Sequence, residues 1–311
     1  MAELLLSTLV PCYNHEDFIT DTIESIWKQN IDNMEIIVID DGSSDNSYEV
    51  LKKLQASSPV PMHVSTQENA GIVKTLNRCL SKAQGKYISL IGSDDQYFPD
   101  ALANLLTKIE KKDDIKVIYA NAREFKGDEL FEKMHQDQAL EILSLTPAEI
   151  EKKLRTEVPR PLLTQCAIFE KSLLDSIHGW DETLMLDDWP LNIKVFHYLA
   201  QHKYKHDFLD IDLVKYRFHD TNLHKNYYKM YLMIEEVILR YAPKKTRKKF
   251  LSKEAFDHGK ILLKKNKPAG NKLLFKSLIL HFDLFKFLDI LRLTIKYNLI
   301  NTFQKQNTQK N

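Results

Sequence analysis

The first hundred residues alternate short apolar runs with segments of helical periodicity, and this alternation constrains the fold more than any other feature. Apolar runs occupy residues 4–10, 35–39 and 87–91, and the segment MHVSTQENAG, residues 62–71, contains a further predicted strand and its loop. Each is followed by a polar loop and then by apolar residues at helical spacing. Strands that alternate with helices pair in parallel through right-handed crossovers. We therefore predict an α/β fold with a mostly parallel, Rossmann-like sheet flanked by helices.

The segment YISLIGSDDQYFPDAL, residues 87–102, ends its apolar run in two adjacent carboxylates, Asp94 and Asp95. Ligands of open α/β sheets usually bind at the carboxyl ends of the strands. Two adjacent carboxylates repel each other, and a divalent cation keeps both ionised; oxygen ligands favour Mg²⁺ or Mn²⁺ over zinc. In the alternative interpretation, Ser93 or Asp94 caps a helix that begins near Pro99, and no metal is needed.

Polar residues also follow the three earlier predicted strands. They are Tyr13 and Asn14, Asp40 and Asp41, and Asn69 and Gly71. Neighbouring parallel strands bring these ends to one edge of the sheet. No GxGxxG follows the first strand and no GxxxxGK[ST] occurs anywhere, which excludes those two modes of nucleotide binding.

Composition sets the class of protein. A chain of 311 residues with 43% hydrophobic residues can bury a sizeable core. The three cysteines are widely spaced and form no CxxC pair, which argues against a disulfide framework or a zinc site and favours a reducing, cytoplasmic setting. The N-terminus lacks the basic start of a signal peptide, and no apolar run approaches the roughly 20 residues of a membrane span.

Charge is divided unevenly along the chain. Residues 240–311 contain 18 Lys and Arg against 4 Asp and Glu, whereas the whole chain contains 44 and 43. An acidic body with a basic C-terminal segment suggests an anionic surface as a partner. Residues 272–300 are dense in Leu, Ile and Phe around the whole helix, which favours an amphipathic segment in a membrane interface. The alternative is a helical hairpin packed on the preceding domain with a solvated basic face.

The segments STLVPCYN, VIDDGSSDNS, ENAG and SLIGSDD, in this order, resemble the inverting glycosyltransferase family 2 of the GT-A fold. Any one of them alone is compatible with an ordinary loop, but the ordered set is specific. The resemblance extends over roughly residues 5–240. It implies a catalytic domain over 1–240, with a nucleotide-sugar half at 1–120 and an acceptor half at 121–240, followed by a helical basic extension at 241–311.

The resemblance also implies the donor site. The nucleotide-sugar residues would be Pro11, Tyr13, Asp40, Asp41, Asn69, Gly71, Lys74 and Asp94. Asp95 would be the principal ligand of Mn²⁺ or Mg²⁺, and Asp94 would reach the ribose or the metal. His219, in the late segment YRFHDTNLH, would be a further metal ligand or simply a packed or surface side chain.

Two departures from the family pattern concern the same site. Gly92 stands where many members carry an Asp, and Leu76 precedes Asn77 where an Arg is common. Lys74 or Arg78 could supply the missing phosphate contact, although a solvated helix face is an equal alternative.

HGWDETLMLDDWPL, residues 178–191, is similar to the acceptor-side motif of the family. The similarity implies that Asp188 is the general base, Asp187 its neighbour in the place of the usual Glu, and Trp189 a wall of the acceptor site. The alternative is an N-cap pair for the following helix, which carries Leu191 and Val195.

Together these features predict a metal-dependent glycosyltransferase that moves a sugar from a nucleotide-diphosphate sugar to a saccharide or lipid-linked saccharide, in surface polysaccharide synthesis at the inner face of the plasma membrane. The rival hypothesis is a nucleotide-sugar-binding protein of the same fold that has lost turnover, which the Gly92 departure suggests. Nucleic acid is not an expected partner, because the basic C-terminus lacks aromatic platforms for bases.

Overall fold

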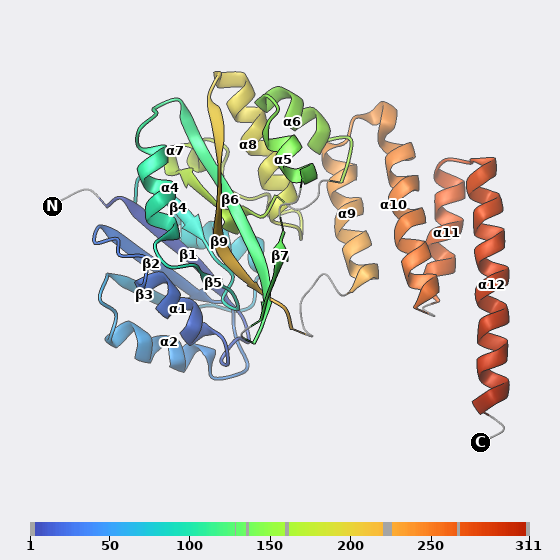
Figure 1. Ribbon diagram of the computed structural model, residues 1–311, viewed down its shortest axis with the longest axis horizontal. Helices are drawn as coiled ribbons and strands as arrows, with labels where there is room; N and C mark the ends of the chain where they lie inside the picture. Colours follow the sequence, from blue (N-terminus) through green and yellow to red (C-terminus); the bar gives the residue numbers. More distant parts are fainter. Residues whose placement is uncertain are drawn as a thin grey trace. The chain divides into compact units, whose positions relative to one another are not determined.

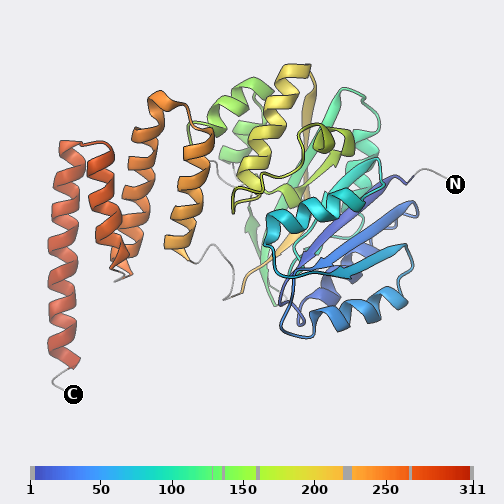
Figure 2. The same ribbon diagram turned by 180° about the vertical axis from the view of Figure 1, so that it is seen from behind.

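The computed structural model describes residues 4–127, 129–134, 137–158, 162–219, 226–265 and 268–308 (Figures 1 and 2). The chain forms two compact units. The N-terminal unit comprises residues 1–154 and 159–219, and the C-terminal unit comprises 155–158 and 220–311.

The described part of the N-terminal unit contains a nine-stranded sheet. Its strands are β1 (Leu6–Cys12), β2 (Met34–Asp40), β3 (Met62–Thr66), β4 (Tyr87–Leu90), β5 (Gln96–Tyr97), β6 (Ile115–Lys126), β7 (Glu129–Lys133), β8 (Ala167–Glu170) and β9 (Lys205–Arg217). Their order is β3-β2-β1-β4-β8-β6-β9-β5, and β7 pairs with β6.

The first half of the sheet is parallel, as predicted. β1 pairs in parallel with both β2 and β4, and β2 with β3. Every residue of β2 and β4 is buried, as expected for parallel strands covered on both faces. β8 then runs antiparallel to β4 and β6, while β6 and β9 lie side by side in parallel (Figure 1). The carboxyl ends of β1, β2 and β4 therefore share one edge, where the motifs were expected.

Helices follow the strands in the predicted alternation. They are α1 (Ile19–Trp27), α2 (Ser47–Ala56), α3 (Ile72–Lys82), α4 (Ala101–Ile109), α5 (Asp137–Leu143), α6 (Pro147–Leu154), α7 (Lys171–Ser176) and α8 (Asp188–His202), with a 3₁₀ turn, η1 (Thr164–Cys166). The strand predicted near 163–169 is thus a 3₁₀ turn followed by a short strand. The helix expected after Pro190 begins at Asp188, with Pro190 in its first turn, where a missing N–H costs nothing.

The C-terminal unit contains α9 (Tyr227–Tyr241), α10 (Lys244–Lys264), α11 (Ala269–Leu280) and α12 (Leu284–Thr308). α10 packs against both α9 and α11, so the predicted boundary at residue 240 falls near the end of a helix that belongs to this unit. Among the described residues, no helix is both long enough and apolar enough to cross a membrane.

Candidate active site

Two loops at the carboxyl edge of the sheet are hydrogen-bonded to each other. After β1, the backbone N–H of Asn14 donates to Ser43 Oγ at 2.9 Å, and the side-chain oxygen of Asn14 accepts from the Ser44 N–H at 2.8 Å. The His15 N–H donates to Ser47 Oγ at 2.9 Å. The serines of DGSSDNS therefore tie the loop after β1, residues 13–15, to the loop after β2 and its junction with α2, residues 41–47. We call these two loops the rim.

Asp41 organises the third motif. Its Oδ1 accepts from the side chain of Gln67 at 2.6 Å and from the Ala70 N–H at 2.8 Å, and its Oδ2 accepts from the Gly71 N–H at 2.8 Å. Gly71 has φ +85°, a conformation that favours glycine, and it caps the start of α3. Asp41 is thus engaged with protein groups on both oxygens, and its predicted contact with the nucleotide remains a prediction.

Asp40 keeps an acceptor free. Its Oδ2 accepts from the Ser43 N–H at 3.2 Å and from Thr66 Oγ1 at 3.0 Å, while Oδ1 is buried and has no hydrogen-bond partner. A buried carboxylate oxygen without a donor is costly. Asp40 therefore has one acceptor that the described protein groups leave unused, and its predicted contact with the nucleotide remains a prediction.

The other predicted donor-site residues lie around this rim. Pro11 is in β1 opposite Ile39 and is partly buried. Tyr13, Asn69 and Lys74 are exposed, so all three side chains are accessible to a ligand. Leu76 stands where many family members carry an Arg before Asn77. It is fully buried in α3, so its side chain does not reach the ligand side of the sheet edge.

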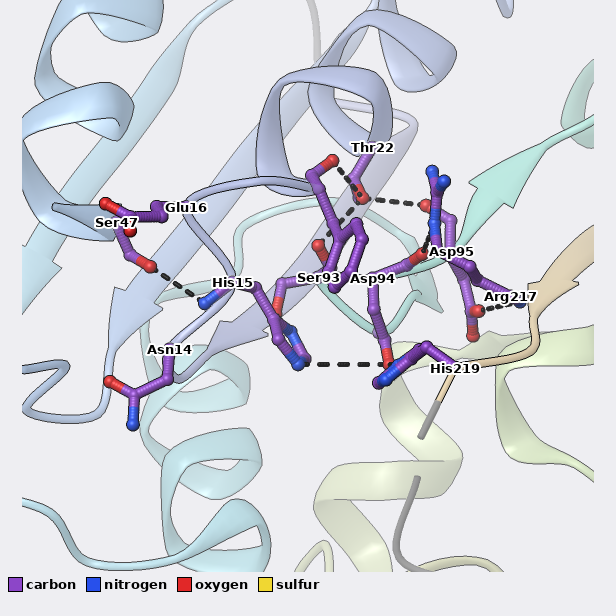
Figure 3. Close-up of polar contacts among 12 residues, drawn as sticks. Asn14, His15, Glu16, Thr22, Ser47, Ser93, Asp94, Asp95, Arg217 and His219 are labelled. Carbon is purple, nitrogen blue, oxygen red and sulfur yellow. Dashed lines mark hydrogen bonds and ion pairs between the residues drawn. The ribbon is translucent and has the colours of Figure 1, made fainter. Parts of the chain in front are cut away.

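The Ser-Asp-Asp turn after β4 is held from α1. The hydroxyl of the buried Thr22 donates to the backbone oxygen of Asp95 at 2.7 Å and lies 3.0 Å from that of Ser93 (Figure 3). Helix α4 begins at Ala101 with Asp100 at its N-cap, well beyond the turn. The alternative in which Ser93 or Asp94 caps this helix is therefore wrong.

Asp95 points into the protein. Its Oδ1 accepts from the Arg217 N–H at 2.7 Å and its Oδ2 from Gln165 Nε2 at 2.8 Å, and the residue is 3% exposed. Burial raises the pKa of the Asp95 carboxyl, and the charge of Asp94 raises it further. Its two oxygens already have donors, so the geometry does not present Asp95 to an ion.

Asp94 points to two histidines instead (Figure 3). Asp94 Oδ2 lies 2.9 Å from His219 Nε2 and 3.9 Å from His15 Nε2. One ligand atom from each of the three residues lies within 4.8 Å of the others, and all three side chains are partly exposed. We call these residues the His-Asp-His cluster. Burial lowers the pKa of His15, which favours the neutral imidazole that metal ions require.

This cluster fits a divalent cation. A carboxylate oxygen and two imidazole nitrogens are established metal ligands, and they converge at the edge where the sheet delivers its loops. The sequence predicted Asp95 as the principal ligand and His219 as a second candidate. The structure places Asp94 and His219 in the cluster, adds His15, which the sequence analysis did not identify, and leaves Asp95 outside it. The role of Asp95 as the principal ligand stays a prediction.

The second acid pair lies at the start of α8. Asp188 Oδ1 accepts from the Thr164 N–H at 2.7 Å and also from the Thr164 hydroxyl. Burial raises the pKa of Asp188 to about 7, and the charge of Asp187 contributes to the rise. Asp187 occupies the N-cap position of α8, but its side chain makes no capping hydrogen bond. The structure does not bear out the alternative in which the pair serves as a cap.

Two residues of η1 are hydrogen-bonded to the two acid pairs, and a residue of β9 lies near both pairs. Thr164 holds Asp188, and the adjacent Gln165 holds Asp95. Burial raises the pKa of the Tyr216 phenol, and the negative charges of both acid pairs raise it further, so Tyr216 lies within electrostatic range of each. Sequence analysis did not identify these residues, because nothing in TQC or KYR marks them before the chain folds.

Trp189, which the sequence predicted as a wall of the acceptor site, is buried between two helices. It is 6% exposed, and its indole N–H donates to the backbone oxygen of Leu154 at 2.7 Å. The side chain therefore packs α8 against α6. Its proposed role as a wall of the acceptor site stays a prediction.

Curated relatives match the N-terminal part of the chain. The glycosyltransferase GlyG of Streptococcus pneumoniae is 32% identical over 143 residues, which is 45% of this chain and 48% of that protein. TuaG of Bacillus subtilis, a putative teichuronic acid biosynthesis glycosyltransferase, is 33% identical over 102 residues, or 33% of this chain and 40% of that protein. The chain thus matches less than half the length of these relatives.

Solved structures share the fold. TarS of S. aureus in complex with UDP-GlcNAc superposes with a TM-score of 0.60 at 19% identity, covering 88% of this chain and 79% of that one. A mannosyltransferase of Pyrobaculum calidifontis in complex with GDP-Man and Mn²⁺ has a TM-score of 0.59 at 16% identity, covering 97% and 83%. These likenesses confirm the predicted GT-A fold.

The family model described as glycosyl transferase family 2 matches residues 7–177, more than half of the chain. That range contains the rim loops, the Ser-Asp-Asp turn and η1. The chain belongs to glycosyl transferase family 2.

Proposed function

We propose that this enzyme transfers a sugar from a nucleotide-diphosphate sugar to a hydroxyl group of a saccharide, with inversion at the anomeric carbon. The observation that carries the proposal is that the adjacent Thr164 and Gln165 hold Asp188 and the Ser-Asp-Asp turn, so that two sites lie on either side of η1. One site offers ligands for a cation, and the other offers a carboxyl group whose pKa is near neutral. A glycosyl transfer needs both, one for the leaving diphosphate and one for the attacking hydroxyl.

Asp188 is the proposed base. A carboxylate with a pKa of about 7 is ionised in part at neutral pH and is a stronger base than an ordinary aspartate. It removes the proton from the acceptor hydroxyl as that oxygen attacks the anomeric carbon. The bond from that carbon to the diphosphate oxygen breaks on the opposite face, so a single displacement inverts the configuration.

The donor would lie along the loops that follow β1, β2 and β3. Asp40 Oδ1 would accept a hydrogen bond from the nucleoside, and exposed Tyr13 would stack on the base. The His-Asp-His cluster would hold a divalent cation, which neutralises charge on the departing diphosphate. UDP-GlcNAc in TarS and GDP-Man in the mannosyltransferase support a nucleotide sugar as donor.

A panel of UDP- and GDP-sugars, each with Mn²⁺ or Mg²⁺, tests the proposal. The true donor should raise the melting temperature of the protein, and its nucleoside diphosphate should be released in the presence of acceptor. Asp188→Asn should keep the thermal shift and reduce release at least about hundredfold. Asp175→Asn, an exposed aspartate on α7, is the matched control.

Near-normal transfer by Asp188→Asn would contradict the assignment of the base. A donor that binds to the wild type without release or transfer would favour the rival hypothesis of a binding protein without turnover. The anomeric proton coupling of the product, measured by NMR, decides between inversion and retention.

For the acceptor, we propose a saccharide, free or lipid-linked, in surface polysaccharide synthesis. The teichuronic acid assignment of TuaG supports this class. We also propose that the enzyme acts at the inner face of the plasma membrane through its C-terminal unit, where large apolar side chains are exposed between residues 275 and 295. They are Phe275, Ile279, Phe282, Leu284, Phe285, Phe287, Leu288, Leu291 and Ile295.

The basic residues of the same segment favour an anionic lipid surface as its partner. Residues 272–296 contain Lys272, Lys276, Lys286, Arg292 and Lys296 and only two acidic residues. A lysine or arginine near anionic lipid contributes about 1 kcal/mol, and the exposed phenylalanines can enter the interface.

Sedimentation with vesicles of anionic or neutral lipid tests this partner. The wild type should bind the anionic vesicles, and binding should weaken as salt is raised. The double variant Phe282→Ser/Phe285→Ser should bind less. Leu130→Ser/Phe131→Ser, which removes exposed apolar residues of β7 in the other unit, should not. Equal binding by both variants would contradict the proposal.

A further inference from the structure

A side chain at position 92 would compete for space with Asp94 at the Ser-Asp-Asp turn. A Cβ atom built on Gly92 would lie 2.7 Å from Asp94 Oδ1 and 3.3 Å from Asp95 Oδ2. An aspartate at position 92, as the family pattern has it, would therefore displace the Asp94 side chain. Asp95 is engaged with Gln165 and Arg217, which leaves the carboxylate of Asp94 facing the two histidines.

His15 occupies the position from which a further ligand can reach the same ion (Figure 3). Its ring comes from the loop after β1, whereas His219 comes from the segment after β9, so the two approach Asp94 from different elements. The imidazole rings lie 6.0 Å apart, centroid to centroid, and nearly perpendicular. Phe18 contacts both rings, at 5.8 Å from His15 and 5.2 Å from His219, and limits their rotation.

The hydrogen bonding of His15 leaves the correct nitrogen available. A metal-bound imidazole needs a free lone pair on one nitrogen and a proton on the other. Ser93 Oγ lies 2.7 Å from His15 Nδ1 and can accept that proton, so Nε2 is left to face Asp94. Ser93 is itself 2% exposed and is held in the turn, which fixes the ring.

The two separations between Asp94 and the histidine nitrogens agree with a shared ion. Two atoms that each lie about 2.1 Å from one ion are separated by about 3 Å at a right angle and by about 4.2 Å when opposite. Asp94 Oδ2 is 2.9 Å from His219 Nε2 and 3.9 Å from His15 Nε2.

We propose that His15 is a third metal ligand in place of the carboxylate that Gly92 removes, and that this two-imidazole set selects Mn²⁺ or Co²⁺ over Mg²⁺. Imidazole nitrogens favour transition metals, whereas Mg²⁺ prefers oxygen ligands and retains its waters. The inference deepens the proposed function and rests on it, since the remaining positions of the ion are for diphosphate oxygens.

Direct binding of Mn²⁺ tests the proposal without any sugar transfer. The EPR signal of free Mn²⁺ is followed as the full-length protein is titrated, with and without UDP, and Mg²⁺ is then added as competitor. His15→Gln should weaken Mn²⁺ binding at least about tenfold and reduce the preference over Mg²⁺. Asp94→Asn and His219→Gln should weaken it as well. His202→Gln, at the exposed end of α8, is the matched control and should bind as the wild type.

Pulsed EPR on the wild type keeps the proposal testable if His15→Gln does not fold. Mn²⁺ bound to the protein should show magnetic coupling to two imidazole nitrogens, identified by labelling histidine with ¹⁵N. Coupling to one imidazole, unchanged Mn²⁺ affinity in a folded His15→Gln, or no Mn²⁺ binding by the wild type would each overturn it. Sugar transfer supported equally by Mg²⁺ would overturn the selectivity while leaving the proposed function intact.

Discussion

Thr164 and Gln165 are adjacent in η1, yet each holds a different acid of the site. Thr164 donates to Asp188 from its N–H at 2.7 Å and from its hydroxyl, and Gln165 Nε2 donates to Asp95 at 2.8 Å. The oxygen of the Gln165 side chain also accepts from the Gly92 N–H at 3.1 Å. One short turn therefore sets the position of the proposed base relative to the Ser-Asp-Asp turn.

The pH dependence of transfer should follow Asp188. Its pKa is raised to about 7, and the proposed base acts only when ionised. Transfer should therefore be fast above pH 7 and fall about tenfold for each pH unit below it, because the ionised fraction falls in that proportion. Initial rates between pH 5 and 9, at saturating donor and metal, check this. A rate that stays constant down to pH 5 would exclude Asp188 as the base.

Thr164→Val should move that pH profile. The substitution conserves volume and keeps the backbone N–H bond but removes the hydroxyl that stabilises ionised Asp188. A hydrogen bond to a charged group contributes about 1.5–3 kcal/mol, so the rate at pH 7 should fall about tenfold and recover at higher pH. Thr107→Val, which removes a hydroxyl on the exposed face of α4, serves as the control. A rate loss that is the same at every pH would point to a purely structural effect.

Gln165→Leu should destabilise the N-terminal unit. The buried Asp95 Oδ2 loses its donor, which costs about 1–3 kcal/mol. All three tryptophans, Trp27, Trp180 and Trp189, lie in this unit, so urea unfolding followed by tryptophan fluorescence reports it. Gln84→Leu, at an exposed position, should leave the midpoint nearly unchanged. Equal midpoints for the two variants would contradict the role of Gln165.

Gly92→Ala should affect the metal site more than stability. The added methyl group would meet Asp94 Oδ1 at 2.7 Å, and that oxygen is the mobile end of a side chain that can turn away at low cost. We expect a melting temperature close to that of the wild type and Mn²⁺ binding weakened at least about tenfold. Calorimetric titration with Mn²⁺ measures the affinity. Unchanged binding would show that Asp94 does not need its present orientation.

Asn77→Asp should weaken the hydrogen bonds that hold residues 180–182 of the acceptor-side motif. Asn77 Nδ2 donates to the Trp180 backbone oxygen at 3.0 Å and to Glu182 at 2.9 Å, and its Oδ1 accepts from the Trp180 N–H at 2.8 Å. The aspartate keeps the acceptor but loses both donations and adds repulsion with Glu182. We expect a loss of about 1–3 kcal/mol in stability and a raised KM for acceptor with donor KM unchanged. Asn104→Asp on α4, whose side chain bonds only within its own turn among the described contacts, is the control.

Much of the fold could be predicted because it depends on local patterns. Continuous apolar runs such as residues 34–40 are buried on both faces of a parallel sheet, and the loops after them must meet at one edge. The family motifs lie in those loops, so Asp40, Asp94 and Asp188 could be identified before the side chains had positions. The short η1 turn at 164–166 was predicted as a strand, since apolar periodicity over so few residues does not distinguish the two.

The sequence by itself determined that this chain forms an α/β sheet with acidic residues at its carboxyl edge, because strand and helix periodicity and the order of motifs are properties of neighbouring residues. Only the tertiary structure decided which acid faces the two histidines. Asp94 and Asp95 are adjacent and chemically identical, but their surroundings come from distant segments. Gln165 and Arg217 donate to Asp95 and bury it, while His219 and His15 converge on Asp94. Those contacts depend on the order in which the sheet places β1, β4, β8 and β9, and no local pattern in the chain encodes that order.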